Sequence, residues 1–444
     1  MGVILLRKKK LTSFQVIILG FFGVIIIGTL LLMLPLSSRD GRMTPFLDAL
    51  FTSTSAVCVT GLVLHDTATY WSMFGQLVIL ILIQIGGMGV ITVAAAFAMI
   101  SGRKISLMQR STMQEAISAP KVGGIVRLTS FIIKTTLLIE LLGAAIMAPV
   151  FCRDFGVKGL WMALFHAISA FCNAGFDLMG VRAPFSSLTS FSAQPVINLV
   201  IMLLIIIGGI GFLTWDDIQS NRLHVRQYRM QSKIILSTTA FLLAVPAVYL
   251  FCFEFDSLPL KQRILASLFQ AVTPRTAGFN TVDMTSLSEA GQCITMVLML
   301  IGGSPGSTAG GMKTTTVAVL FATAIATFRR QESAHFFGRR VEDDVVKNAS
   351  TILMMYLALF FLGGLAISML EGLPVLTCLF EAASAVGTVG LSLGITAGLG
   401  IISKLILILL MFCGRVGGLT LIFAALSGTR KNVSKFPREK VTVG

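Results

Sequence analysis

Four glycines recur along this chain, each after a short apolar stretch. They are spaced 114, 103 and 112 residues apart. The segments that they end are Cys58-Val59-Thr60-Gly61, Cys172-Asn173-Ala174-Gly175, Arg275-Thr276-Ala277-Gly278 and Gly387-Thr388-Val389-Gly390. This recurrence predicts one structural unit repeated four times, and in a membrane protein it predicts a pore on the repeat axis.

The composition predicts a membrane protein. Hydrophobic residues make up 55% of the chain and charged residues 12%, and the mean hydropathy is +0.88. A soluble fold of this composition would lack polar surface. Residues 13–36 and 70–100 carry no charge, and about 20 apolar residues suffice for a helix to cross the hydrocarbon core. We therefore expect a multi-pass membrane protein.

The net charge of +15 has an uneven distribution. Of the 35 Lys and Arg residues, 22 lie in residues 1–12, 101–124, 216–233, 328–349 and 427–444. The segments that alternate with these, residues 37–69, 152–194, 253–290 and 371–400, hold 8 basic and 11 acidic residues. An excess of Lys and Arg marks the cytoplasmic side of a membrane protein. Both termini are therefore predicted to be cytoplasmic, and the charge does not indicate nucleic-acid binding.

The predicted fold is all-α, with four tandem repeats around a pseudo-fourfold pore. Each repeat has a spanning helix, a short re-entrant pore helix, a glycine loop and a second spanning helix. This gives eight spanning helices and four re-entrant pore loops. The predicted boundaries are residues 1–12 for the N-terminus, 13–100, 125–215, 234–327 and 350–426 for the repeats, and 427–444 for the tail.

The second spans of the first two repeats are predicted to be continuous helices over residues 70–100 and 195–215. Each contains a glycine pair, Gly86-Gly87 or Gly208-Gly209. We interpret these pairs as small-residue faces for close helix packing rather than as hinges. The third repeat is one residue shorter before its glycine than the others, so its loop is expected to follow a different backbone path.

The glycine loops are the candidate selectivity filter. A cation can exchange its water shell for backbone carbonyl oxygens, and glycine adopts the backbone angles that such a loop requires. Pore helices that direct their C-terminal ends at the centre add partial negative charge there. The candidate filter residues are Val59, Thr60, Gly61, Asn173, Ala174, Gly175, Thr276, Ala277, Gly278, Thr388, Val389 and Gly390.

A Gly/Ser/Pro run interrupts the second span of the third repeat, where a continuous helix is disfavoured. We expect an intramembrane loop over residues 302–313 that obstructs the path and can move. Its similarity to a phosphate-binding loop is accidental, because no strand precedes it. The candidate gate residues are Gly302, Gly303, Ser304, Pro305, Gly306, Ser307, Thr308, Gly310, Gly311, Lys313 and Arg415.

Arg415 lies fifteen residues into the last spanning segment. A charge at that depth is costly unless it faces the interior, so we favour a functional barrier below the filter over a purely structural pair. Lys313 is expected to stabilise the closed loop or to repel cations. The seven cysteines and four histidines are scattered, and no metal site other than one for potassium is expected.

Two other classes of function compete with a pore. A secondary carrier coupled to sodium or protons also uses broken helices, but many such carriers have inverted repeats, whereas every repeat here is predicted to start and end inside. An intramembrane enzyme is disfavoured because the chain lacks a His/Glu metal set, a Ser/His pair and paired intramembrane carboxylates.

These motifs resemble those of the Trk/Ktr/HKT superfamily of potassium transporters, most closely the membrane subunit of bacterial Ktr systems. The resemblance covers nearly the whole chain and includes the run from Phe269 to Asn280. It implies channel-like potassium uptake, with the four motifs as the filter, residues 302–313 as the gating loop and Arg415 below the filter. Gly61 implies potassium preference, because relatives that favour sodium tend to carry Ser there.

The resemblance also implies a setting and partners. It predicts a homodimer in the bacterial cytoplasmic membrane, with sodium as a possible co-ion or activator and transport as a channel or a symporter. It further predicts a cytosolic ring of nucleotide-binding subunits of the KtrA type. Because this chain has no dinucleotide-binding motif in a βαβ setting, we expect no cofactor in it, and any ATP, ADP or NAD control would come from that partner.

Overall fold

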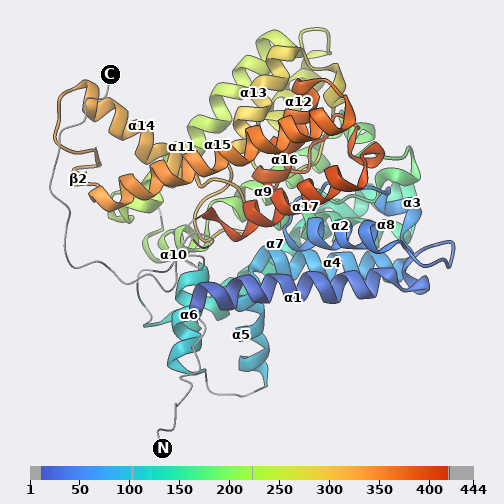
Figure 1. The fold of residues 1–444 in the computed structure, drawn as a ribbon, viewed down its shortest axis with the longest axis horizontal. Coiled ribbons are helices and arrows are strands. Elements are labelled where there is room, and N and C mark those ends of the chain that lie inside the picture. The colour runs from blue at the N-terminus through green and yellow to red at the C-terminus, as the bar shows by residue number, and fades with distance from the viewer. Residues whose placement is uncertain are drawn as a thin grey trace, which may run out of the picture.

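The computed structural model describes residues 12–420 except 102–104, 118, 120, 122, 223 and 419. Helices dominate this part of the chain, and the long ones run side by side (Figure 1). Four helices are long and apolar enough to cross a membrane, or six if each of two bent pairs counts as one span. The predicted N-terminal segment, apart from Thr12, and the tail after residue 426 lie outside the described residues.

The first half of the chain contains two sets of helices in the same order. In the first set these are α1 (Ser13–Met33), α2 (Phe46–Val57), α3 (Thr67–Tyr70), α4 (Met73–Met88) and α5 (Val90–Ile100). A connecting helix, α6 (Leu107–Ile117), follows. The second set consists of α7 (Ile125–Phe155), α8 (Lys158–Phe171), α9 (Pro195–Gly209) and α10 (Phe212–Asn221).

The second half repeats the order of long and short helices. Its helices are α11 (Met230–Tyr249), α12 (Leu260–Val272), α13 (Glu289–Leu300), α14 (Thr314–Phe328), α15 (Asp343–Glu371), α16 (Val375–Gly387) and α17 (Ile401–Val416). A π-helical turn, Leu250–Glu254, extends α11. Strands β1 (His335–Phe336) and β2 (Arg339–Arg340) form a hairpin between α14 and α15. Short 3-10 turns lie at Pro35–Ser37, Met179–Val181, Thr189–Phe191, Val225–Gln227, Met284–Ser286 and Thr396–Gly398.

Each short helix packs against the long helices beside it in sequence. Helix α2 contacts α1 and α4, and α8 contacts α7 and α9. The close approach of α1 to α2 depends on Gly28, where a Cβ would lie 2.7 Å from Leu82 and closer still to Ser53. Ser53 Oγ in turn donates to the carbonyl oxygen of Ile25 at 2.7 Å. The short helices, of 12 to 14 residues, are thus held inside the bundle.

The predicted continuous second spans are wrong in the first two repeats. Helices α4 and α5 meet at 97°, and α9 and α10 meet at 96°. The chain turns at Gly89 (φ 84°, ψ 133°) and at Gly211 (φ 92°, ψ 140°), and Gly417 after α17 has nearly the same angles (φ 86°, ψ 141°). Residues with a side chain rarely adopt these angles, so glycine ends the helix there.

The glycine pairs before these turns do pack closely. A Cβ on Gly86 or on Gly208 would overlap the carbonyl oxygen of Val57 or Phe171, the last residues of α2 and α8. The small-residue interpretation is therefore correct for these contacts, and the helices bend two or three residues later. In the third repeat the interruption between α13 and α14 is a long loop, as predicted.

Candidate ion pathway

The four glycine loops begin where the short helices α2, α8, α12 and α16 end. A Ser or Thr near each helix end holds the loop. Its carbonyl oxygen accepts from the residue before the glycine: Thr60 N to Ser55 O at 2.8 Å, Ala174 N to Ser169 O at 2.8 Å, Ala277 N to Thr273 O at 3.0 Å and Val389 N to Ser384 O at 2.8 Å. Three of these bonds span five residues, whereas the bond of Ala277, in the third repeat, spans four. The shorter third segment therefore follows its own path, as predicted.

The side chains of these Ser and Thr residues also form hydrogen bonds with the backbone of the loops. Ser55 Oγ accepts from Gly61 N at 3.1 Å, and Ser384 Oγ accepts from Gly390 N at 2.9 Å. Ser169 Oγ instead donates to the Phe176 carbonyl oxygen at 2.7 Å. These residues were not identified from the sequence as the support of the loops.

The backbone of each loop carries two residues with positive φ, two positions apart. The second is the glycine, at 91°, 70°, 80° and 95° for Gly61, Gly175, Gly278 and Gly390. The first has a side chain, and the four are Val59 (56°), Asn173 (58°), Thr276 (69°) and Thr388 (52°). Alternating signs of φ turn successive peptide groups the same way, unlike the opposed groups of a strand. Such a loop can present consecutive carbonyl oxygens to a cation.

The four glycines contact one another in a closed ring. A Cβ on Gly61 would lie 2.5 Å from the Ala174 carbonyl oxygen, and one on Gly175 would lie 2.8 Å from that of Ala277. Gly278 faces the Val389 oxygen and Gly390 the Thr60 oxygen just as closely. Each glycine therefore contacts the next repeat, and the fourth returns to the first. A methyl group at any of these positions would displace backbone of the neighbouring loop.

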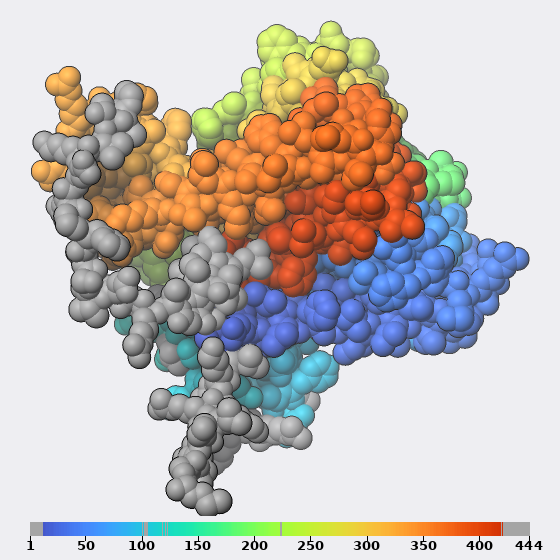
Figure 2. Space-filling model, viewed as in Figure 1, coloured from blue at the N-terminus to red at the C-terminus, as the bar shows by residue number. Residues whose placement is uncertain are grey.

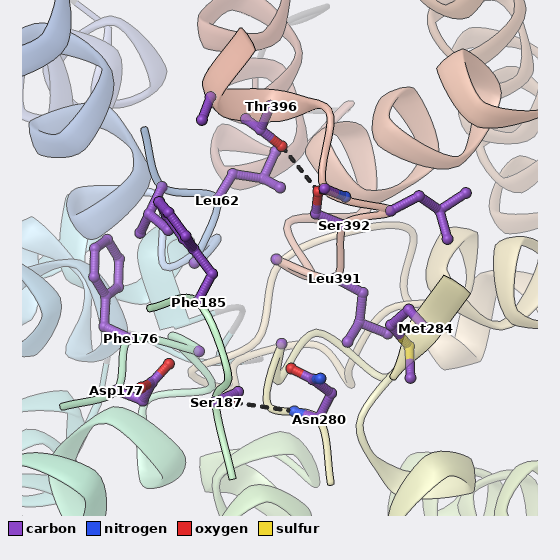
Figure 3. Close-up of a pocket in the computed structure, with 18 of the residues that line it drawn as sticks. Leu62, Phe176, Asp177, Phe185, Ser187, Asn280, Met284, Leu391, Ser392 and Thr396 are labelled. Carbon is purple, nitrogen blue, oxygen red and sulfur yellow. Dashed lines mark hydrogen bonds between the residues drawn. The ribbon is translucent and has the colours of Figure 1, made fainter. Parts of the chain in front are cut away.

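One cavity of about 260 Å³ lies against this ring and is lined by all four glycines. Residues from the four loops surround it in Figure 3, where Ser187 bonds Asn280 (3.2 Å) and Ser392 bonds Thr396 (3.0 Å). Three acidic residues, Asp66, Asp177 and Asp283, are also among those that line it.

The carboxyl group of Asp177 has a perturbed pKa. Burial raises its pKa from the ordinary value to about 7. The backbone N–H of Met179, which donates to it at 2.8 Å, opposes this effect, and the charge of Asp66 adds to it. The charge of Asp177 is therefore present above about pH 7 and is lost as the pH falls through that value.

The predicted gate loop lies on the other side of the ring. A Cβ on Gly310 would meet the side chain of Thr388 in the fourth loop, and one on Gly311 would lie 2.9 Å from the carbonyl oxygen of Gly387. The loop closes on itself through Gly302 N to Met312 O at 2.8 Å and Thr314 N to Gly303 O at 3.0 Å. These contacts place it directly behind the fourth filter loop.

Hydrogen bonds attach the gate loop to the bend between α9 and α10. Ser304 N donates to Gly209 O at 3.0 Å, and Phe212 N donates to Gly306 O at 2.7 Å. Thr308 Oγ1 donates to the Phe171 carbonyl oxygen at 3.0 Å. Loop movement would have to break these bonds or carry the bend with it.

Arg415 joins three parts of the chain below the ring. Its Nη1 donates to the carbonyl oxygen of Thr308 in the gate loop. Its Nη2 donates to the carbonyl oxygens of Gly86 and, at 3.2 Å, Gly87, which lie just before the α4–α5 bend. The charge thus finds the carbonyl partners that a buried guanidinium requires.

The side chain of Lys313 hydrogen-bonds within the gate loop itself. Its Nζ donates to the Ala309 oxygen at 2.8 Å and to the Gly310 oxygen at 3.4 Å. Lys313, Arg415 and loop residues such as Gly306 line a second cavity of about 230 Å³. Residues 302–313 therefore lie between this cavity and the glycine ring, and the side chains of Lys313 and Arg415 are on the cavity side.

A comparison with known families accounts for this arrangement. The family TrkH, described as "Cation transport protein", matches residues 8–431. The chain belongs to the TrkH family. As a member of this family with several helices long and apolar enough to cross a membrane, it is a multi-pass membrane protein.

Two relatives at 40% identity match over almost their full length. The "Potassium/sodium uptake protein NtpJ" of Enterococcus hirae is 40% identical over 449 residues, covering 98% of each chain. The "Ktr system potassium uptake protein B" of Bacillus subtilis is 40% identical over 446 residues, covering 99% of this chain and 98% of the relative. The crystal structure of the potassium transporter TrkH from Vibrio parahaemolyticus shares the fold, with a TM-score of 0.74, 20% identity, and coverage of 95% and 86%.

Two further polar contacts of this family member were not apparent from the sequence. Asn173 Nδ2 donates to the Arg275 carbonyl oxygen at 3.3 Å and to Thr276 Oγ1 at 3.2 Å, which ties the second filter loop to the third. Behind the second loop, Gln84 Nε2 donates to both carboxyl oxygens of the buried Glu140 at 3.1 Å. No spacing along the chain predicts either contact.

Proposed function

We propose that this protein is the ion-translocating subunit of a potassium uptake system. Potassium would leave the cavity of about 260 Å³, here called the outer cavity, and pass the ring of Gly61, Gly175, Gly278 and Gly390. It would enter the second cavity, of about 230 Å³ and here called the inner cavity, when the gate loop moves. The closed ring of glycine and carbonyl contacts is the observation that carries this proposal. Backbone oxygens replace the water of a cation without a fixed charge that would trap it.

The relatives' names support potassium as the substrate. Two relatives at 40% identity are named for potassium uptake, and one of them also for sodium. Gly61 in the first filter loop favours potassium selectivity by the resemblance stated above, and sodium would act as a co-ion or activator. The twelve predicted filter residues and the eleven predicted gate residues keep these roles in the proposal.

Gating would depend on residues 302–313 and Arg415. The loop lies between the filter and the inner cavity, and Arg415 holds it to the α4–α5 bend. We place both termini and the basic linkers in the cytoplasm of a bacterium. The proposed assembly is a homodimer on a KtrA-type cytosolic ring that binds the regulatory nucleotide. The relatives are transport proteins, and we propose no enzymatic activity and no bound cofactor for this chain.

A secondary carrier for a cation or another solute remains the second candidate. The interrupted α13–α14 segment favours it, because carriers often bind their substrate at such breaks. Around the ring, each glycine loop contacts the next one in sequence, and the fourth contacts the first. This arrangement favours a pore instead.

Potassium-dependent growth tests the proposal. In a bacterial strain without its own potassium uptake systems, the wild-type chain should restore growth at low potassium, and Gly175→Ala should not. Gly123→Ala is the matched control, because no atom lies within 4 Å of a Cβ at Gly123. Equal growth with both variants, at equal membrane levels of protein, would contradict the filter assignment.

A further inference from the structure

A hollow of about 780 Å³ lies between α5, α6 and α7, away from the ion pathway. Three basic residues line it, Arg110 of α6 and Arg127 and Lys134 of α7, together with Ser130 and Phe131. Residues 127, 130, 131 and 134 share one face of α7 by helical spacing. No acidic residue is among those that line the hollow. Helices α5 and α6 extend from the bundle below α1 (Figures 1 and 2).

Some basic residues elsewhere on the predicted cytoplasmic face form ion pairs with acids. Arg229 at the start of α11 pairs with Asp216 at 2.9 Å and Asp217 at 3.3 Å. Lys347 near the start of α15 lies 3.8 Å from Asp344. Within the part of the chain that the structure describes, Arg110, Arg127 and Lys134 form no ion pair. Three like charges around one concavity favour an anion.

The length of α7 sets the depth of this hollow. Lys134 and Arg153 are 19 residues apart on one helix, which corresponds to about 28 Å at 1.5 Å per residue. A hydrocarbon core is about 30 Å thick. Glu140, the acid between them, is buried in the protein and bound by Gln84. Lys134 therefore lies at one edge of the hydrocarbon core, and Arg127, two turns nearer the helix start, lies at the level of lipid headgroups.

Apolar side chains near the hollow are also open to the surroundings. Phe97 of α5 is 67% exposed, and Leu107 and Met108 of α6 are 78% and 51% exposed. Helix α5 carries no charge and leaves α4 at 97°. If α4 follows the membrane normal, α5 lies nearly in the membrane plane, so its apolar surface would contact acyl chains. An acidic soluble protein would leave these side chains in water.

We propose that this hollow binds the headgroup of an anionic phospholipid, with its phosphate between Arg110, Arg127 and Lys134. Ser130 can donate a further hydrogen bond to the phosphate. The acyl chains would lie along α7 and the apolar side chains of α5 and α6. Basic pockets between membrane helices on the cytoplasmic side are suited to such headgroups. The assignment to the inner leaflet rests on the orientation in the proposed function.

Lipid retention by the purified full chain tests this site. In a neutral detergent, phosphatidylglycerol or phosphatidylcholine is added and bound lipid is measured by native mass spectrometry. The wild type should retain phosphatidylglycerol preferentially. The variant Arg110→Gln, Arg127→Gln, Lys134→Gln should bind it about tenfold more weakly or worse, because each basic residue near the surface contributes to the attraction.

The matched control is Arg329→Gln, Arg339→Gln, Lys347→Gln, which removes the same charge from exposed positions outside the hollow. It should keep the wild-type preference for phosphatidylglycerol. If the first triple variant elutes as an aggregate, Arg127→Glu alone replaces it, and its affinity for phosphatidylglycerol should fall with an unchanged elution profile.

Three results would overturn the proposal. One is equal retention of phosphatidylglycerol by the wild type and the hollow variant. A second is that millimolar inorganic phosphate binds in the hollow as well as phosphatidylglycerol does, which would identify a free-phosphate site. A third is displacement of the lipid by poly-glutamate, which would indicate an acidic protein partner. Lipid retention requires no ion transport, so its failure is distinct from failure of the proposed potassium pathway, which is measured in neutral vesicles.

Discussion

Replacement of Arg415 should open the pathway. In the structure its guanidinium donates one bond to the gate loop at Thr308 and two to the oxygens of Gly86 and Gly87. Only the first of these bonds ends on the loop, and the other two anchor the guanidinium to the α4–α5 bend. A hydrogen bond with a charged partner contributes about 1.5–3 kcal/mol, so Arg415→Ala should raise the ratio of open to closed loop by about 10- to 150-fold.

The assay is rubidium flux into liposomes that contain the purified membrane subunit alone. Arg415→Ala should increase the initial flux, up to the limit set by a fully open loop. Arg415→Lys separates two roles, because it keeps the charge but cannot hold both sets of carbonyl oxygens. If the hydrogen bonds of Arg415 to both sets of oxygens close the loop, Arg415→Lys also increases the rubidium flux. If the positive charge alone is the barrier, the flux of Arg415→Lys stays at the wild-type level. Unchanged or lower flux in Arg415→Ala would refute the role of Arg415 in closing the path.

Three more outcomes follow from the geometry. Gly61→Ser should lower the preference for potassium over sodium in whole-cell uptake, because its Cβ would lie 2.5 Å from the Ala174 oxygen and would displace it. Unaltered selectivity would contradict the filter role. Deletion of residues 306–311 should raise flux in liposomes, since it removes the obstruction behind Thr388, and lower flux with intact protein would count against it. Uptake at low potassium should fall as the external pH drops from 8 to 6, because Asp177 has a pKa of about 7 and loses its charge. Asp177→Asn should abolish this pH dependence. If the pH dependence persists in Asp177→Asn, Asp177 is not its cause.

The sequence predicts the ring because its main determinant is local. Each short helix, its terminal Ser or Thr and its glycine lie within a few residues, and the same order recurs four times. The one-residue deletion before Gly278 is likewise visible in the sequence, and it corresponds to the hydrogen bond at Ala277, which spans four residues where the other three span five. The positive φ at Thr388 and its equivalents was not predictable, because residues with a side chain rarely adopt it.

The bends and the contacts of Arg415 could not be predicted from local pattern. Apolar residues continue through Gly89 from α4 into α5, so composition indicates one helix. The bend depends on a single backbone conformation at that glycine. Arg415 bonds to Gly86, 329 residues earlier in the chain, and the sequence indicates only that so deep a charge needs oxygen partners.

The central claim is that cations pass through the glycine ring, and ion flux through the purified protein tests it most directly. Liposomes of neutral lipid would be loaded with potassium, sodium or rubidium in turn, and the flux of each ion measured for the wild type and Gly175→Ala. We predict flux of potassium and rubidium well above that of sodium, and its loss in the variant. Equal flux of all three ions, or full flux in Gly175→Ala, would contradict the account.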